Sequence, residues 1–156
     1  MSPISPTSAA IHKQVQDWIS TGTVVSAPHD TVWNSPLLRV RKKDALGRHS
    51  ADRICIDPRH INAMLKVTTY PLPDIPALLR KLQGLFCIST LDIKAAFTQC
   101  PVYEPHRPIL SFTHQGKHYM FRGTPYGLTP LSGHYQRFIE IYLQNCEDYN
   151  YCDFFY

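Results

Sequence analysis

The chain has 156 residues and a mass of 17.9 kDa, the size of one ordinary domain, and such a length buries about two-thirds of its unfolded surface. Hydrophobic residues make up 44% and charged residues 18%, which excludes intrinsic disorder, and no apolar run approaches the ~20 residues that cross a bilayer. The first ten residues lack the basic start and apolar core of a secretory signal. We therefore expect a soluble intracellular protein, cytoplasmic or nuclear and not secreted, with no membrane partner.

The net charge of +4 is unevenly distributed along the chain. Residues 39–66 hold eight Lys or Arg against three Asp, a local net charge of +5. In a strand, the run RVRKKD at 39–44 would place Arg39, Arg41 and Lys43 on one face. That face is either a solvated edge strand protected by charge or a phosphate-binding surface.

The first half of the chain is predicted to contain a helix, a hairpin and a second helix. An amphipathic helix is expected over residues 9–20, with Ser8 as its cap and Gly22 at its end. Residues 35–43 and 53–57 are predicted to pair as strands through the polar loop 45–52. A helical turn should follow at 59–65. A helix capped by Asp74 and ended by Gly84 should then place its apolar stripe on a sheet.

The second half is predicted to alternate strands with a long helix. A strand is expected at 86–91, and residues 109–113 and 117–121 should form a second hairpin. The clearest helical pattern begins near residues 129–130 and runs to about 144. This mixed order favours an α+β fold over a parallel doubly wound sheet.

Two carboxylates stand where apolar strands are expected to end. Asp92 follows the predicted strand 86–91, and Asp153 lies in the string YCDFFY at the end of the sequence. Magnesium prefers hard oxygen ligands that converge from separate segments, so these two residues are candidates for one metal site. Phe97 is close enough to Asp92 for both to contact one bound molecule, and an aromatic ring under a sugar could exclude a 2′-hydroxyl by contact.

Zinc and disulfides are not favoured by the cysteine and histidine pattern. The five cysteines are odd in number and form no CxxC pair, so reduced and mostly buried thiols are expected. His114 and His118 have a spacing compatible with zinc, but Gly116 between them indicates the tip of a hairpin.

The ordered motifs of the chain resemble one family. The strings SPLLRVRKKD, RICIDPRHIN, YPLPDIPALLRKLQG, LDIKAAFTQ, GTPYGLTP and YCDF resemble the reverse transcriptases of long-terminal-repeat retrotransposons, especially the gypsy type, over about residues 20–156. The resemblance implies a right-hand polymerase with an antiparallel palm sheet and flanking helices. It implies fingers at 20–85 and a palm at 86–156, with fingers strands returning near 105–122. Residues 1–19 precede this likeness and are expected to be a helical lead-in.

The same resemblance implies a role for individual residues. Asp92 and Asp153 would be catalytic ligands of two Mg²⁺ ions, with a backbone carbonyl from Ile93 as a further ligand. The residues that would bind the nucleotide are Lys42 and Arg53 at the triphosphate, Phe97 as the sugar gate, and Tyr126 with Gly127 as the pocket loop. The implied partners are an RNA or DNA template with its primer, deoxynucleoside triphosphates, and the remainder of a Pol polyprotein.

The chain departs from the family pattern in three places. Phe154 stands where the family has a second Asp, and a phenyl ring cannot ligate magnesium. The sequence stops two residues later, so the palm is expected to be incomplete, with no thumb. Asp52 replaces a large aromatic residue, and residues 48–51 lengthen the loop before Arg53.

These departures lead to an expected function and two alternatives. We expect a reverse transcriptase fragment, an RNA-directed DNA polymerase by family, that is inactive by itself. The first alternative is a nucleic-acid-binding module without catalysis, and the second is a decayed retroelement remnant.

Overall fold

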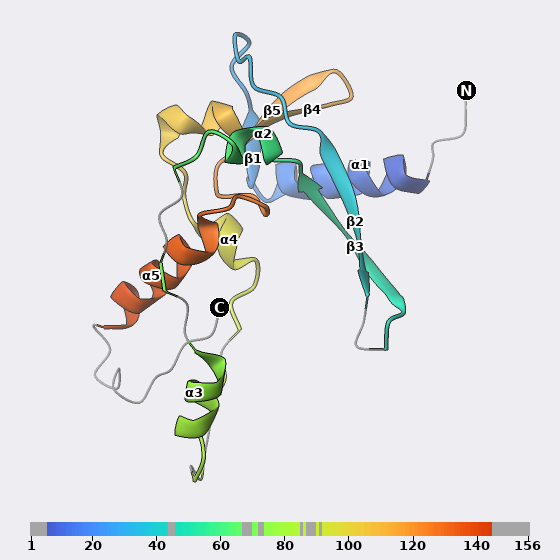
Figure 1. Ribbon diagram of the computed structural model, residues 1–156. Helices are drawn as coiled ribbons and strands as arrows, with labels where there is room; N and C mark the ends of the chain where they lie inside the picture. The colour runs from blue at the N-terminus through green and yellow to red at the C-terminus, as the bar shows by residue number, and fades with distance from the viewer. Residues whose placement is uncertain are drawn as a thin grey trace. The chain divides into compact units, whose positions relative to one another are not determined.

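A computed structural model describes residues 6–43, 46–66, 70–71, 74–84, 86, 90 and 92–144 (Figure 1). The chain forms two compact units. Unit 1 combines residues 1–64 with residues 97–128, and unit 2 combines residues 65–96 with residues 129–156. Helices mix with antiparallel strands, which confirms the predicted α+β class. Among the described residues, no helix combines the length and the apolar character needed to span a membrane.

Unit 1 begins with helix α1, Pro6–Ser20. The predicted helix is confirmed, but it starts before Ser8, so that residue lies inside the helix instead of capping it. Val15 on its apolar face is fully buried, and Trp18 packs against the core of unit 1. Gly22 follows with φ of +68°, a conformation that favours glycine and ends the helix.

Strands β2 (Leu37–Lys43) and β3 (His49–Ile56) form an antiparallel hairpin, as predicted. Strand β3 begins four residues earlier than predicted, so the connecting loop is shorter. Val40 pairs with Arg53, and Arg39 pairs with Ile54. Paired residues point to the same face of a sheet. Ile54 is buried, so Arg39 shares the inner face and Arg53 lies on the outer one.

The second sheet of unit 1 has the strand order β1-β5-β4 and is antiparallel throughout. Strands β4 (Ser111–His114) and β5 (Lys117–Phe121) confirm the second predicted hairpin. Strand β1 (Val24–Ser26) was not predicted, because three residues carry too little periodicity. The prediction that residues 109–110 are strand was wrong. They end a 3₁₀ helix, η1 (Glu104–Leu110), which is favoured because Pro105 and Pro108 cannot donate ladder hydrogen bonds.

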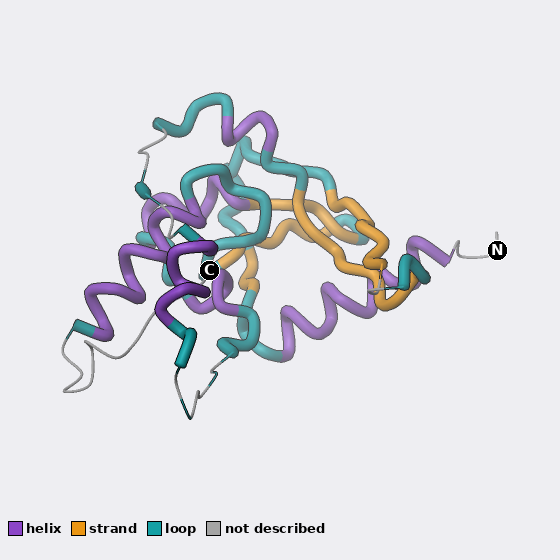
Figure 2. Tube along the Cα trace, turned by 60° about the horizontal axis from the view of Figure 1, so that its bottom comes forward, coloured by secondary structure: helices purple, strands orange, loops and turns teal. Residues whose placement is uncertain are grey.

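The core of unit 1 brings residues from both halves of the sequence together. Trp18 meets Phe112 and Phe121 edge to face, at centroid distances of 5.9 and 5.0 Å. Helix α1 contacts β1, β2 and β3, and Figure 2 shows it lying along the strands of this unit. The buried hydrophobic cluster consists of Val15, Val24, Ile56, Ile61, Leu110, Phe112 and Phe121.

Two short helices, α2 and α4, complete the description of unit 1. Helix α2 (Arg59–Asn62) confirms the predicted helical turn and buries Ile61. Helix α4 (Ala96–Gln99) was not predicted and carries Phe97. The four residues of α4 are too few for a periodic pattern, so sequence reasoning gave no helix there.

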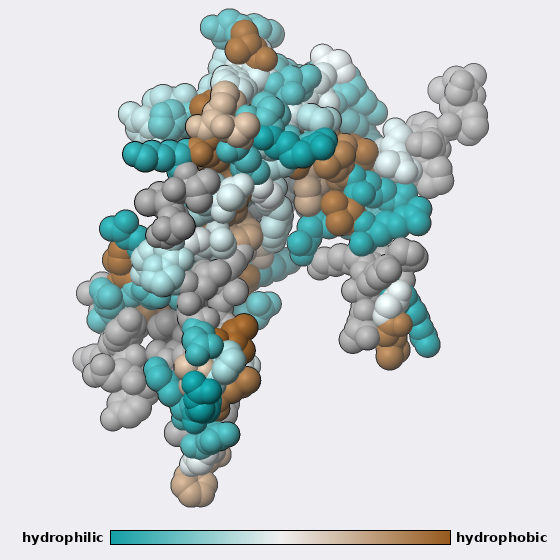
Figure 3. Space-filling model, in the orientation of Figure 1, coloured by the Kyte–Doolittle hydropathy of each residue, from teal (hydrophilic) through white to brown (hydrophobic). Residues whose placement is uncertain are grey.

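Unit 2 contains helices α3 (Ile75–Lys81) and α5 (Leu131–Leu143), both predicted from their apolar stripes. In α5, Tyr135 and Gln136 are buried, and Tyr70 donates a hydrogen bond to Glu140. Of the apolar stripe of α3, Ile75 and Leu79 are 57% and 56% exposed and Leu82 is half-buried. The strand on which α3 was expected to pack lies mostly outside the described residues, so that packing stays a prediction. Figure 3, in which hydrophobic residues are brown, shows apolar atoms at the surface of α3.

Most of the predicted strand 86–91 lies outside the described residues. Only Phe86 and Thr90 of that segment are described, and both are exposed.

Candidate functional site

The loop at residues 121–128 is fastened to the segment that follows α4. The backbone N–H and the hydroxyl of Thr124 both donate to the carbonyl of Cys100, at 3.0 and 2.9 Å. Gly123 forms a β-bridge with Pro101. A Cβ at Gly123 would lie 2.0 Å from the Thr98 carbonyl oxygen, so only glycine permits this approach.

This attachment places the aromatic rings of Phe97 and Tyr126 against each other. Their centroids are 5.3 Å apart and their planes meet at 75°, the edge-to-face geometry that aromatic pairs prefer. Both side chains are half-buried, so each ring also retains a solvent-facing surface. Phe97 comes from α4 and Tyr126 from the loop, two segments that sequence reasoning had assigned to one site.

Arg53 completes a three-residue cluster with these rings. Its guanidinium carbon lies 4.6 Å from the centroid of the Tyr126 ring, within the range of a cation–π contact. Arg53 is exposed on the outer face of β3. The ring therefore orients the guanidinium without neutralising its charge, which leaves its N–H groups available to an anion.

Gly127 holds the loop in a conformation that other residues avoid. Its φ is +106°, and a Cβ there would lie 3.0 Å from the Pro58 Cγ. The Asn62 side chain donates to the Gly127 carbonyl at 2.9 Å, which ties the loop to α2. The structure thus brings together Arg53, Phe97, Tyr126 and Gly127, four of the five residues predicted to bind a nucleotide.

The inner face of the β2–β3 hairpin is less cationic than the sequence suggested. Arg39 forms a 2.7 Å ion pair with Asp52 and donates to the Thr7 hydroxyl at 3.0 Å. Arg41 pairs in register with Asp52 on this same face. Asp52 therefore offsets part of the positive charge on the inner face. The charge of Arg53, on the outer face, is not offset by this ion pair.

Asp57 anchors the turn between β3 and α2. It is 5% exposed and accepts hydrogen bonds from the Arg59 side chain at 2.5 to 3.0 Å. These hydrogen bonds lower the pKa of Asp57 below its usual 3.8.

Two cysteines lie close to the cluster residues in sequence. Burial raises the pKa of the Cys55 thiol in β3, and the nearby Arg53 charge opposes that shift only in part. Cys55 and Cys100 are both half-buried free thiols.

The remaining predicted site residues are not brought together within the described part of the chain. Asp92 and Ile93 belong to unit 2 and are exposed. Lys42 lies in β2, but its side chain is outside the described residues, as are Asp153 and Phe154 entirely. Among the residues that the structure describes, no three His, Cys, Asp or Glu side chains cluster as a metal site. The exposed carboxylate of Asp92 is the kind of hard oxygen donor that suits Mg²⁺.

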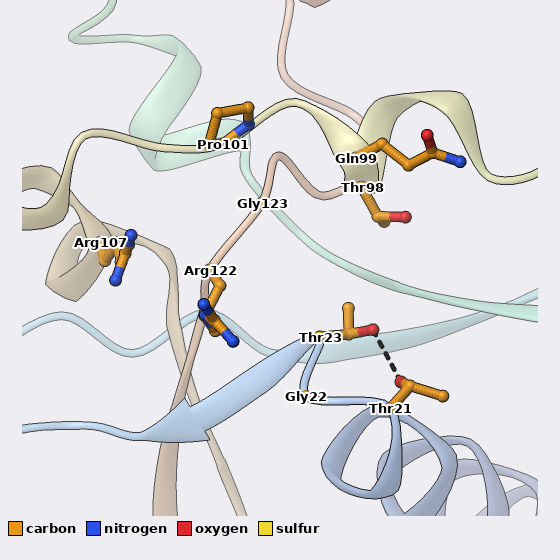
Figure 4. Close-up of a pocket in the computed structure, with 9 residues that line it drawn as sticks. All are labelled: Thr21, Gly22, Thr23, Thr98, Gln99, Pro101, Arg107, Arg122 and Gly123. Atoms are coloured by element: carbon orange, nitrogen blue, oxygen red, sulfur yellow. Dashed lines mark hydrogen bonds between the residues drawn. The ribbon is translucent and has the colours of Figure 1, made fainter.

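Unit 1 also contains an open pocket of about 250 Å³ that the sequence did not predict (Figure 4). The side chains of Thr21 and Thr23 meet at its wall through a 2.8 Å hydrogen bond. Arg107 is held in place by donating to the Val102 carbonyl. No periodic pattern links these positions, so sequence reasoning had no signal for them. The lining residues are Thr21, Gly22, Thr23, Thr98, Gln99, Pro101, Arg107, Arg122 and Gly123.

Comparison with known proteins places these residues in context. Residues 40–155 match the family "Reverse transcriptase (RNA-dependent DNA polymerase)". The retrovirus-related Pol polyprotein from transposon gypsy of Drosophila melanogaster is 32% identical over 136 residues, which cover 86% of this chain and 13% of that protein. The corresponding polyprotein from transposon opus, also of Drosophila melanogaster, is 28% identical over 134 residues, with the same coverage. The chain thus spans about an eighth of the length of these relatives.

Solved structures share the fold. The foamy viral protease-reverse transcriptase in complex with an RNA/DNA hybrid superimposes with a TM-score of 0.69 at 17% identity, over 92% of this chain and 18% of that one. A second structure of that viral protein, in complex with double-stranded DNA, gives a TM-score of 0.65 at 20% identity, over 92% of this chain and 23% of that one. The match to the family model covers well over half of the chain, and the chain therefore belongs to the reverse transcriptase (RNA-dependent DNA polymerase) family.

Proposed function

We propose that this chain supplies the nucleotide-binding part of an RNA-directed DNA polymerase. The observation that carries the proposal is the cluster of Arg53, Tyr126 and Phe97, in which an oriented guanidinium stands beside two partly exposed rings. A deoxynucleoside triphosphate offers the matching groups, because it has phosphates for the cation and flat or apolar surfaces for the rings.

Each residue of the cluster has a distinct role in this proposal. Arg53 donates hydrogen bonds to the triphosphate oxygens, and Lys42 adds a second positive charge from β2. Phe97 lies under the sugar and rejects a 2′-hydroxyl by contact. Tyr126 keeps Arg53 in position, and Gly127 lets backbone approach the bound nucleotide closely.

The metal part of the site rests on residues of unit 2. Asp92, Asp153 and the Ile93 carbonyl would hold Mg²⁺, which stabilises charge on a transferring phosphoryl group when it is bound. The side chain of Phe154 offers no oxygen at the place where the family has a second Asp. We propose that this substitution leaves the chain by itself unable to extend a primer at a useful rate.

The proposed partners follow from the same reasoning. They are an RNA or DNA template with its primer, and the remainder of a Pol polyprotein. In this assignment residues 1–19 are a lead-in, residues 20–85 are fingers with strands returning near 105–122, and residues 86–156 contribute to the palm.

Nucleotide binding is tested by titrating the purified chain with dGTP in isothermal titration calorimetry. We expect Arg53→Ala to weaken binding by about tenfold or more, because a hydrogen bond to a charged group contributes about 1.5–3 kcal/mol. Arg80→Ala is the matched control, since Arg80 is an equally exposed arginine on α3 in unit 2. Equal affinity for dGTP in the two variants would contradict the proposed contact between Arg53 and the triphosphate.

Catalysis is tested separately by primer extension on an RNA template with Mg²⁺. We expect no incorporation by the parent chain, and Phe154→Asp tests whether the missing carboxylate is sufficient to restore it. Incorporation by the parent chain would contradict the proposed role of Phe154.

A second candidate is a nucleic-acid-binding module without catalysis, and the outer face of the β2–β3 hairpin favours it. Leu38 and Val40 are 43% and 49% exposed beside Arg53 on this face, where Figure 3 shows apolar and polar atoms next to each other. An apolar and cationic ribbon suits single-stranded nucleic acid. Retention of an RNA/DNA hybrid that falls with salt and is unchanged in Asp92→Asn, without binding of dGTP, would select this candidate.

A further inference from the structure

Helix α1 and the tip of the β4–β5 hairpin are joined by two histidines. The Nδ1 of His12 and the Nε2 of His114 share a hydrogen bond of 3.1 Å, although 102 residues separate them in the sequence. The ring centroids are 5.4 Å apart and the planes are tilted by 32°. Both side chains are half-buried, so the pair is held by its surroundings and remains open to solvent.

The distance between the two nitrogens fits a shared metal ion. Two imidazole nitrogens about 2.1 Å from one ion, at angles of 90° to 110°, lie roughly 3.0–3.4 Å apart. His114 directly precedes the hairpin turn, where Gln115 and Gly116 have φ of +49° and +72°. A small rotation of the two rings would replace their hydrogen bond by two lone pairs directed at one ion.

The neighbouring histidine of the hairpin does not belong to this pair. His118 lies 3.0 Å from the Trp33 carbonyl through its Nε2, so that ring nitrogen is already engaged. Among the described residues no further His, Cys, Asp or Glu joins His12 and His114. Water would occupy the other coordination positions, as at an open metal site.

We propose that His12 and His114 form a binding site for a divalent transition-metal ion of the nickel, copper or zinc class. The bound ion links α1 to the β4–β5 hairpin and stabilises unit 1 by binding only the folded chain. This site is separate from the proposed magnesium ligands, because imidazole nitrogen prefers these softer ions and magnesium prefers oxygen.

The proposal is tested with NiCl₂ at pH 7.5 in the presence of a non-chelating reductant, since nickel suits imidazole ligands. Calorimetry should show one site per chain, and His12→Gln and His114→Gln should each weaken it by about tenfold or more. His29→Gln, which removes an exposed histidine elsewhere in unit 1, should bind as the parent does. Nickel should also raise the melting temperature of the parent chain by about 5–11 °C at a hundredfold excess over Kd, and chelation by EDTA should reverse the rise.

A second readout avoids substitutions altogether. Paramagnetic nickel at a low molar ratio should broaden the ring proton signals of His12 and His114 before those of the other histidines. Unchanged nickel affinity in His12→Gln and His114→Gln, or broadening that starts at other histidines, would overturn the proposal.

Discussion

The guanidinium carbon of Arg53 lies 4.6 Å from the centroid of the Tyr126 ring, a contact between two residues that are 73 positions apart. One comes from the hairpin strand β3 and the other from the loop after β5. The contact fixes the direction of a positive charge beside the paired rings of Phe97 and Tyr126, and the proposed function depends on that orientation.

Replacing Tyr126 by Leu should release Arg53. We expect a loss of about 1–2.5 kcal/mol in the free energy of unfolding, because the substitution removes both the cation–π contact with Arg53 and the edge-to-face contact with Phe97. Tyr126→Phe keeps the ring and is the matched control. Urea unfolding followed by circular dichroism measures both, and an equal loss in the two variants would assign the effect to the hydroxyl instead of the ring.

Replacing Gly127 by Ala should strain the pocket loop. The φ of +106° is unfavourable for any side chain, and the new Cβ would lie 3.0 Å from the Pro58 Cγ. We expect a loss of roughly 1–3 kcal/mol in the free energy of unfolding, together with weaker dGTP binding. Gly47→Ala is the control, because Gly47 has φ of +75° and nothing within 4 Å of its Cβ position. If both variants lose the same amount, the Pro58 contact contributes nothing.

Replacing Phe112 by Ala should destabilise unit 1 through a cavity. Phe112 is fully buried and meets Trp18 and Phe121 in the core. Removing a buried Phe side chain costs about 3–5 kcal/mol. Val32→Ala, at a position that is 89% exposed, should stay within about 0.5 kcal/mol of the parent. Denaturant unfolding compares the two, and a small loss in Phe112→Ala would show that this core is not tightly packed.

The Asp57–Arg59 pair should make stability depend on acid. The pKa of Asp57 is lowered in the folded chain by the Arg59 hydrogen bonds. The unfolded chain therefore takes up a proton first as the pH falls. The stabilisation is complete above about pH 5 and is lost progressively as the pH falls past the unfolded value of 3.8 and through the lower pKa of the folded state.

Arg59→Gln should raise the pKa of Asp57 and move the acid unfolding midpoint to higher pH. An acid titration followed by circular dichroism measures the midpoint. Arg80→Gln removes one positive charge from α3 and should leave the acid unfolding midpoint unchanged. An unmoved midpoint in Arg59→Gln would show that the ion pair does not contribute to acid stability.

Sequence patterns located the long elements, and the family resemblance named the residues of the Arg53, Phe97 and Tyr126 cluster. Helices α1 and α5 and both hairpins were expected because their apolar residues repeat with a clear period. Arg53, Phe97, Tyr126 and Gly127 were named because ordered motifs resemble one family, and the structure brings these four together. The predicted magnesium ligands remain a prediction, since Asp153 lies outside the described residues and Asp92 belongs to unit 2.

Other features followed from contacts that no local pattern encodes. Strand β1 exists because Val24 pairs with Phe121, and α4 is held by the approach of Gly123 to the Thr98 carbonyl. The segment 109–110 was assigned to a strand because Ile109 and Leu110 are apolar, whereas two prolines upstream favour a 3₁₀ helix.

The sequence by itself determined the α+β class, the family and which side chains carry charge or aromatic surface, because periodicity and motif order are properties of the linear chain. Only the tertiary structure decided that Arg53 faces Tyr126 while Arg39 is neutralised by Asp52, and that His12 meets His114. The physical reason is that strand register assigns each side chain to a face, and packing of α1 on the strands then selects its neighbour from distant sequence.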